Sequence, residues 1–154
     1  MARQFWKVDG EEGTYLMLDS DIEPGMTDAK GLDPGKIQEL FKGERVVVDS
    51  ISSIILSHGI ETALRCLIAG KDLVTASNAN IMFTCYADLH SPLETIKLMR
   101  TSDIFIELKE VIFMNEIERQ LAVHKMRKGA VPRRLIPFLI TEKGIELSTT
   151  SRVV

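Results

Sequence analysis

Hydrophobic residues follow two different periods along the chain, and each period predicts its own kind of element. Apolar residues recur every three to four positions over 59–77, whereas unbroken β-branched runs such as "VVV" at 46–48 are typical of buried strands. The pattern predicts strands over 14–20, 45–50 and 80–86, and helices over 34–43, 59–77 and 91–102. The strand over 80–86 is expected to be buried, like the one over 45–50. Alternating strands and helices of this kind indicate parallel strands with helices packed on the sheet.

Local signals support the ends of two of these helices. Ser91 precedes a proline and stands three residues before Glu94, which is the sequence of a capping box. Asp33 is a plausible N-cap for the helix over 34–43. Gly70 lies inside the helix over 59–77 and costs it about 1 kcal/mol relative to alanine.

From Asp103 onward the pattern changes to that of antiparallel strands. Ile104, Ile106 and Leu108 alternate with other residues, and a turn near 115–116 would close a hairpin. Two more strands are expected over about 134–141 and 145–147. The expected fold class is α/β, a mixed sheet of parallel strands and helices followed by an antiparallel hairpin. A length of 154 residues fits one domain, residues 1–154.

Composition places the chain among ordinary globular proteins. It is 45% hydrophobic and 27% charged, with a formal net charge of -3. Its apolar runs are far shorter than the roughly 20 residues of a membrane span. The first residues, "MARQFWKVDGEEG", lack the apolar segment of a signal peptide, so a cytoplasmic location without membrane contact is expected.

Cysteine and histidine are not arranged as metal ligands. Cys66 and Cys85 sit in apolar segments without a CxxC spacing, and both are expected to be small buried hydrophobes. The three histidines are scattered along the chain, which argues against a zinc site.

Asp49 ends the predicted strand over 45–50. The carboxyl ends of parallel strands carry the ligand site in open α/β sheets, and an acid there can hold Mg²⁺. Asp49 could instead cap a helix that follows it. Both interpretations remain open at this level.

A phosphate-binding loop would have the sequence GxxxxGK[ST]. "GLDPGKI" at 31–37 has only three residues between its glycines, and Ile37 stands where Ser or Thr would bind Mg²⁺. "AGKDL" at 69–73 lies inside a predicted helix. The 154 residues therefore contain no such loop.

A basic cluster extends from Arg119 to Arg134, with six Lys or Arg residues, one His and no acid. It could be a solvated face, a phosphate or nucleic-acid patch, or a pair of cations aimed at a neighbouring subunit's nucleotide. Lys125 and Arg127 are two apart, so on a strand they would point to the same side. The acidic net charge and the lack of interleaved aromatic residues argue against nucleic acid.

The order of these segments resembles a known family. "VVVDSISSII", "IMFTCY", "TSDIFIEL", "VHKMRKG" and "FLITEKGIEL" follow one another as in the RecA-type ATPase core of the KaiC-like family. The resemblance covers roughly residues 14–147. It implies a three-layer RecA-like fold from which the first strand and the P-loop are missing, and "MARQFW" resembles the end of the helix that would follow that loop.

The resemblance also implies roles for individual residues. Asp49 would match the Walker B acid that holds Mg²⁺. Lys125 and Arg127 would match the basic pair that reaches the γ-phosphate of ATP on the adjacent subunit of a ring. Asp19 and Asp21 lie near the position of the family's catalytic acid pair, in place of adjacent glutamates, and no catalytic residue is assigned. ATP and Mg²⁺ are the implied cofactors.

Three functions follow as expectations. The first is a non-catalytic regulatory or signalling module that forms homo-oligomers or associates with a related ATPase subunit. The second is a fragment of an active ATPase whose P-loop lies upstream. The third, which the charge argues against, is a nucleic-acid-binding RecA-like domain.

Overall fold

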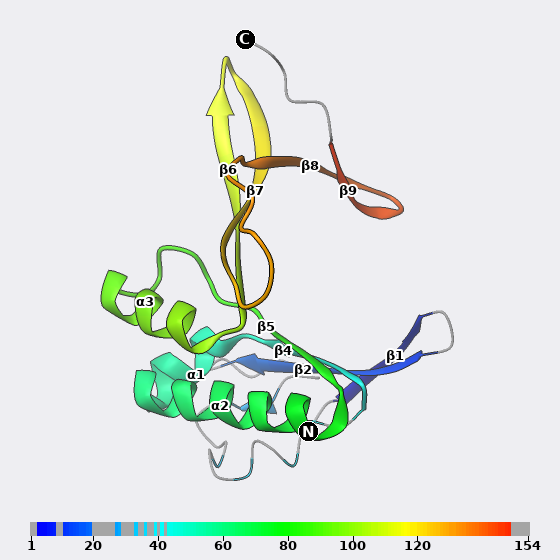
Figure 1. The fold of residues 1–154 in the computed structure, drawn as a ribbon, viewed down its shortest axis with the longest axis vertical. Coiled ribbons are helices and arrows are strands. Elements are labelled where there is room, and N and C mark those ends of the chain that lie inside the picture. The colour runs from blue at the N-terminus through cyan, green and yellow to red at the C-terminus, as the bar shows by residue number, and fades with distance from the viewer. Residues whose placement is uncertain are drawn as a thin grey trace. The chain divides into compact units, whose positions relative to one another are not determined.

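A computed structural model describes residues 3–8, 11–19 and 27–28 by their backbone, single residues at 33, 36, 39 and 41, and residues 43–148. The chain divides into two compact units, Met1–Thr101 and Ser102–Val154. Figure 1 shows the elements of both. The two units are described separately below, and the single domain expected from the length stays a prediction.

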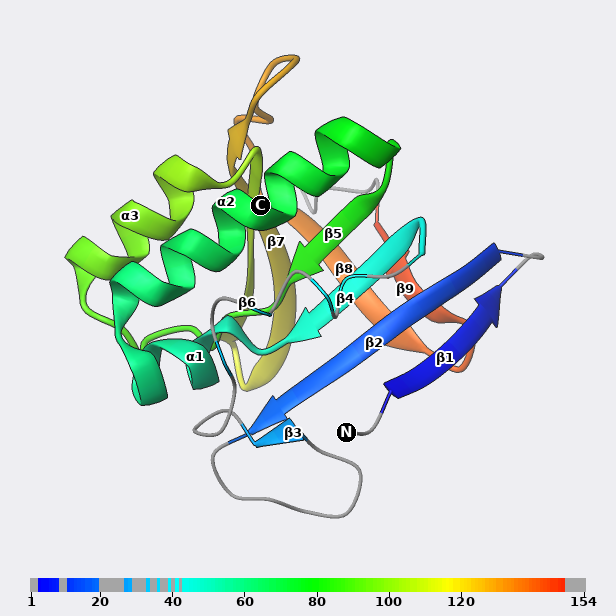
Figure 2. The same cartoon turned by 90° about the horizontal axis from the view of Figure 1, so that it is seen from below.

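The first unit is built on a mostly parallel sheet of five described strands. The strands are β1 (Arg3–Val8), β2 (Glu11–Asp19), β3 (Thr27–Asp28), β4 (Arg45–Asp49) and β5 (Asn80–Phe83). Their order in the sheet is β1-β2-β4-β5, and β3 also pairs with β2. β2, β4 and β5 run parallel, and β1 pairs antiparallel with β2 (Figure 2). The parallel strands predicted from the apolar runs are therefore confirmed.

One expectation for the N-terminus is wrong. "MARQFW" was taken to resemble the end of a helix, but Arg3–Val8 is a strand paired with β2. The sequence carries a hairpin signal that explains this difference. An Asp-Gly dipeptide stands between the two strands in the sequence. Asp-Gly flanked by segments in which hydrophobic and polar residues alternate favours a two-residue hairpin turn.

Three helices follow in the first unit: α1 (Ile51–His58), α2 (Ile60–Ser77) and α3 (Pro92–Thr101). The helices predicted over 59–77 and 91–102 are confirmed as α2 and α3. The sequence pattern missed α1, which is a short helix separated from α2 by Gly59 at a φ of 79°. Among the described residues no helix has the length and apolar character needed to cross a membrane.

The helix predicted over 34–43 lies mostly outside the described residues. Two backbone hydrogen bonds join described residues at and near this segment. The Lys36 amide donates to the Asp33 carbonyl and the Glu39 amide to the Lys36 carbonyl, each at 2.9 Å. Both bonds span three residues, the spacing of a 3₁₀ turn.

The core of the first unit lies between β4 and the helices. Val46 and Val48 are buried on one face of β4, while Val47 is only partly covered. Helix α2 runs alongside the sheet (Figure 1). Gly70 is the position at which α2 lies close to the side chains of β5. A Cβ at that position would lie 3.3 Å from the Phe83 ring. The glycine that weakens α2 locally is therefore a packing requirement.

The burial predicted for β5 is wrong. Within the described sheet β5 has β4 as its neighbour on one side and ends the strand order on the other. Met82 on this strand is 55% exposed. An apolar run of β-branched and aromatic residues does not distinguish a central strand from an edge strand.

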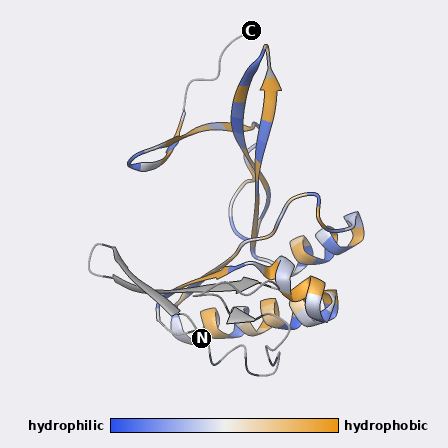
Figure 3. Cartoon of the chain, turned by 180° about the vertical axis from the view of Figure 1, so that it is seen from behind, coloured by the Kyte–Doolittle hydropathy of each residue, from blue (hydrophilic) through white to orange (hydrophobic). Residues whose placement is uncertain are grey.

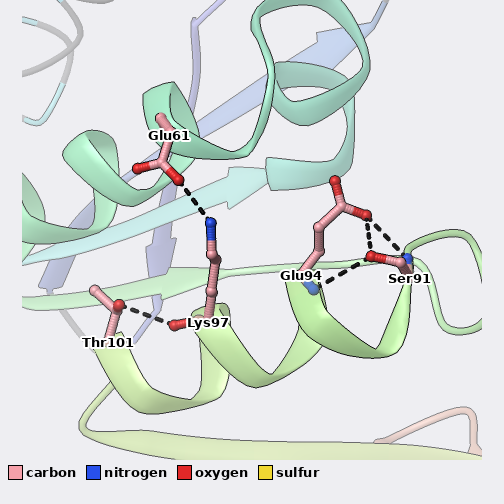
Figure 4. A network of polar contacts seen from close by, with 5 residues as sticks. All are labelled: Glu61, Ser91, Glu94, Lys97 and Thr101. Atoms are coloured by element: carbon pink, nitrogen blue, oxygen red, sulfur yellow. Dashed lines mark hydrogen bonds and ion pairs between the residues drawn. The ribbon is translucent and has the colours of Figure 1, made fainter.

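The predicted capping box of α3 is confirmed. The amide and hydroxyl of Ser91 donate to Glu94 Oε2 at 2.9 and 2.8 Å, and the Glu94 amide donates to Ser91 Oγ at 3.3 Å. These bonds lower the pKa of Glu94. Figure 4 also shows Lys97 of α3 bound to Glu61 of α2 at 2.7 Å, which connects the two helices.

The second unit is an antiparallel sheet. Its order is β6-β7-β8-β9, formed by β6 (Ile104–Phe113), β7 (Glu116–Met126), β8 (Ile136–Thr141) and β9 (Gly144–Leu147). The predicted hairpin is confirmed, with its turn at Met114 and Asn115, which both have positive φ. The C-terminal antiparallel strands form a sheet separate from the one that contains the parallel strands, whereas the pattern suggested one mixed sheet. The three-layer arrangement stays a prediction.

The β6–β7 hairpin has one apolar face. Cross-strand pairs on this face are Ile106 with Val123 and Leu108 with Leu121. Figure 3 shows hydrophobic residues concentrated along β6. The opposite face carries charge, for example Glu107, which binds His124 at 2.6 Å and Lys109 at 3.1 Å.

Candidate functional site

Asp49 and Thr84 come together at the carboxyl ends of β4 and β5. The Thr84 hydroxyl donates to Asp49 Oδ1 at 2.5 Å. Backbone bonds hold Thr84 in place, since its amide donates to the Val48 carbonyl at 3.0 Å and its carbonyl accepts from the Ile51 amide at 2.9 Å. The residue that follows β5 is therefore held against the residue that ends β4.

This geometry decides between the two interpretations of Asp49. Helix α1 begins after Ser50, which is its N-cap residue. Asp49 lies one position earlier and accepts a bond from the neighbouring strand. The capping interpretation is therefore wrong, while a role for Asp49 in binding Mg²⁺ stays a prediction.

The Asp49–Thr84 pair has the chemistry that Mg²⁺ requires. Mg²⁺ prefers oxygen ligands, keeps several waters, and is commonly bound through one or two carboxylates together with phosphate oxygens. The described residues contain no group of three or more His, Cys, Asp or Glu side chains that could form a complete protein cage. Asp49, with Thr84 orienting its carboxylate, fits a Mg²⁺ ion that a nucleotide brings with it.

The sequence reasoning missed Ser52, which fastens the segment after β5 to α1. Ser52 is fully buried. Its hydroxyl accepts from the Tyr86 amide at 2.9 Å, lies 2.8 Å from His90 Nε2 and donates to Cys85 Sγ at 3.5 Å. A serine among the polar residues of "DSISS" carries no signal for these partners, because they are more than 30 positions away.

The two cysteines differ in their surroundings. Cys66 is buried as predicted, and burial raises the pKa of its thiol to about 11. Cys85 is exposed, so the prediction that it is buried is wrong. The reason is its place in the loop that follows the edge strand β5.

Lys125 and Arg127 lie at the end of β7. Lys125 Nζ donates to the Ser102 carbonyl at 2.6 Å, and Arg127 Nη1 lies 3.5 Å from Asp103 Oδ1. The two cations therefore contact adjacent residues just before β6, Lys125 contacting Ser102 and Arg127 contacting Asp103. The same-side placement expected from their two-residue spacing and their contact with a neighbour's nucleotide both stay predictions.

A β-bulge determines which face of the hairpin Lys125 occupies. In the register Ile106 pairs with Val123 and Phe105 pairs with Lys125, so His124 is the extra residue on β7. Strict alternation would place Lys125 on the apolar face with Val123. The bulge moves Lys125 to the opposite, charged face.

The remaining basic residues are separate from this pair. Arg119 binds Glu110 across the hairpin at 2.9 Å. Arg133 and Arg134 are exposed in the segment between β7 and β8. The cluster seen in the sequence therefore divides into groups with different surroundings.

The predicted acid-pair position is described only in part. Asp19 is the last residue of β2 and follows Met17 by two residues. Because Met17 pairs with Asp49, both acids lie at the carboxyl ends of these two parallel strands. Nothing is described of the Asp19 side chain, and Asp21 lies outside the described residues. A catalytic role for either aspartate stays a prediction.

Comparison with known proteins identifies one family. The family model described as "ATPase: KaiC" matches residues 34–152, which include Asp49, Thr84, Lys125 and Arg127. No curated protein matches the chain.

Proposed function

Because the chain belongs to the KaiC ATPase family, we propose that it is a regulatory subunit that acts on ATP bound by a neighbouring subunit. In this proposal a RecA-like core assembles with copies of itself or with a related ATPase. Lys125 and Arg127 reach the γ-phosphate of the neighbour's ATP. The chain itself does not hydrolyse ATP, because its 154 residues contain no GxxxxGK[ST] to hold the phosphates.

The observation that carries the proposal is the placement of Lys125 and Arg127. The bulge puts the Lys125 amine on the charged face of the hairpin, and the Arg127 guanidinium reaches the adjacent residue of the same segment. Positive charge delivered by a neighbouring subunit stabilises the charge that develops on a transferring phosphoryl group. Such a contribution typically raises the rate by about 10³–10⁵.

The test combines the 154-residue chain with a KaiC-family protein that carries a P-loop. Light scattering gives the mass of each protein and of the mixture, with and without ATP and Mg²⁺, and phosphate release gives the rate. We expect no hydrolysis by the chain alone, a larger mass for the mixture, and faster hydrolysis by the P-loop protein in the mixture.

Two variants test the role of the cations. The double variant Lys125→Ala and Arg127→Ala should still join the assembly but should lose most of the rate increase. The matched control, Arg133→Ala with Arg134→Ala, removes the same charge from an exposed segment. This control should keep the full increase in the hydrolysis rate. Hydrolysis by the chain alone, or a normal rate with the first variant, would contradict the proposal.

A second candidate function is favoured by the Asp49–Thr84 hydrogen bond. An acid and a hydroxyl held together at the carboxyl ends of two parallel strands suit an ATPase that is completed by a P-loop encoded upstream. In that case the upstream reading frame contains GxxxxGK[ST], the extended protein hydrolyses ATP, and Asp49→Asn abolishes hydrolysis. A stop codon shortly before Met1 would exclude this candidate.

A further inference from the structure

The two cations assigned to a neighbour's phosphate are engaged within this chain by the residues just before β6. Arg127 Nη1 lies 3.5 Å from Asp103 Oδ1, and Lys125 Nζ donates to the Ser102 carbonyl at 2.6 Å. The Arg127 side chain is nevertheless 67% exposed, and that of Asp103 is 35% exposed. The guanidinium is therefore both bound and accessible from solvent.

The Arg127–Asp103 contact has the properties of an exchangeable one. An exposed ion pair gains little because water screens it and two side chains lose freedom. A guanidinium binds carboxylate and phosphate oxygens through the same planar donors. A triphosphate carries more charge than one carboxylate, so it can replace Asp103 on Arg127.

The placement of Lys125 indicates that it can bind the same anion as Arg127. The bulge at His124 puts Lys125 on the face of Phe105, close to the segment that holds Asp103. Its amine donates to the carbonyl of Ser102, the residue directly before Asp103. An anion that enters beside Arg127 therefore lies within reach of both cations.

We propose that Asp103 is a competitor for phosphate that holds Arg127 when no nucleotide is present and releases it to a neighbouring subunit's triphosphate. This inference rests on the proposed function, because it describes how the cation pair of that function is regulated. Asp103 keeps the pair inactive without nucleotide and sets the phosphate concentration at which the pair responds.

The hairpin provides a matched control for this proposal. Arg119 Nε binds Glu110 Oε1 at 2.9 Å, and this pair is also an exposed arginine–carboxylate contact between β6 and β7. Asp103→Asn and Glu110→Gln change the net charge equally. Only the first removes the carboxylate that faces Arg127.

The experiment is an NMR titration of the full 154-residue chain with inorganic triphosphate, followed at the Arg127 side-chain Nε–H signal. Asp103→Asn should lower the apparent Kd for triphosphate by about two- to fivefold. A change of this size is expected when one exposed ion pair no longer competes with the ligand. Glu110→Gln should leave the Kd near that of the wild type. Asp103→Glu keeps a carboxylate and should restore the wild-type Kd, and backbone spectra report whether each variant is folded.

The possible failures separate the two proposals. Equal effects of Asp103→Asn and Glu110→Gln would overturn the competitor role and show a net-charge effect only. A triphosphate Kd that is unchanged in Arg127→Gln would instead overturn the proposed function, because Arg127 would then not bind phosphate. A loss of binding in Arg127→Gln with no gain in Asp103→Asn would leave the proposed function standing and reject the competitor.

Discussion

Thr84 connects two neighbouring strands through a single charged hydrogen bond. Its hydroxyl donates to Asp49, and its backbone is bonded to both β4 and the start of α1. Hydrogen bonds to charged groups contribute more to stability than bonds between neutral groups. At the scale of single residues, Thr84 therefore determines the orientation of the carboxylate that the family resemblance assigns to Mg²⁺.

Replacing Thr84 with valine keeps the shape of the side chain and removes this bond. We expect Thr84→Val to lower the free energy of unfolding by about 1–3 kcal/mol, because the Asp49 carboxylate loses a partner. Urea denaturation measures the change. The control Thr75→Val removes an exposed hydroxyl that bonds the Lys71 carbonyl in α2, and should change stability by less than about 0.5 kcal/mol. An equal loss of unfolding free energy in both variants would show that the hydrogen bond to Asp49 stabilises the fold no more than an exposed hydroxyl bond does.

The two thiols should differ in their reactivity with pH. Burial raises the pKa of the Cys66 thiol from 9.0 to about 11. Partial burial of its sulfur also raises the pKa of the Cys85 thiol, but Cys85 is an exposed residue, whereas Cys66 is buried. The folded state therefore favours the protonated Cys66 thiol. The stability that this provides is complete below pH 9 and is lost as the pH rises towards 11.

A disulfide reagent at pH 8 measures this difference. One thiol per folded chain should react, two should react in denaturant, and the variant Cys85→Ser should show no fast-reacting thiol when folded. A fast-reacting thiol in folded Cys85→Ser would mean that Cys66 is accessible.

At the scale of elements, α2 packs on β5 through a residue that has no side chain. Gly70 is buried, and a Cβ there would meet Phe83 ring atoms at 3.3 Å and Ile81 Cδ1 at 3.4 Å. Phe83 also packs edge-to-face with Phe41, so its ring has little room to move. The helix and the edge strand are therefore held close by this glycine.

Gly70→Val tests this contact. Adding a branched side chain should lower the free energy of unfolding by about 1–3 kcal/mol, because the Phe83 ring must shift. Thr75→Val places the same branched residue at an exposed position of α2 and serves as the control for a valine in this helix. Urea denaturation of both variants gives the comparison. A Gly70→Val protein as stable as the control would show that the contact is loose.

At the scale of the whole molecule, the charge distribution argues against a nucleic-acid surface. The net charge is -3, and two arginines of the basic cluster face carboxylates, Arg119 on Glu110 and Arg127 on Asp103. Non-specific binding to nucleic acid depends on several cations that are available to phosphates.

We therefore expect no salt-sensitive binding of single- or double-stranded DNA. Fluorescence anisotropy of labelled oligonucleotides, with protein up to about 10 µM and salt from about 50 to 200 mM, measures it. Binding that weakens steeply as salt rises would contradict this expectation and favour the third function considered from the sequence.

Several features could be predicted from the sequence because they depend on neighbouring residues. The period of apolar residues determined α2, α3, β2, β4 and the β6–β7 hairpin, since side-chain direction follows the local backbone. The capping box of α3 is likewise a contact between residues three apart. The order of short motifs also pointed to the family that the comparison shows.

The tertiary structure alone decided how distant residues meet. Thr84 lies 35 positions from Asp49, and Ser52 lies 38 from His90, so no local pattern could pair them. Burial of β5 depends on how many strands flank it. The two-residue spacing of Lys125 and Arg127 predicts that they share one side of a strand. The bulge at His124 decided which face of the hairpin Lys125 occupies, because one extra residue reverses every later side chain on the strand.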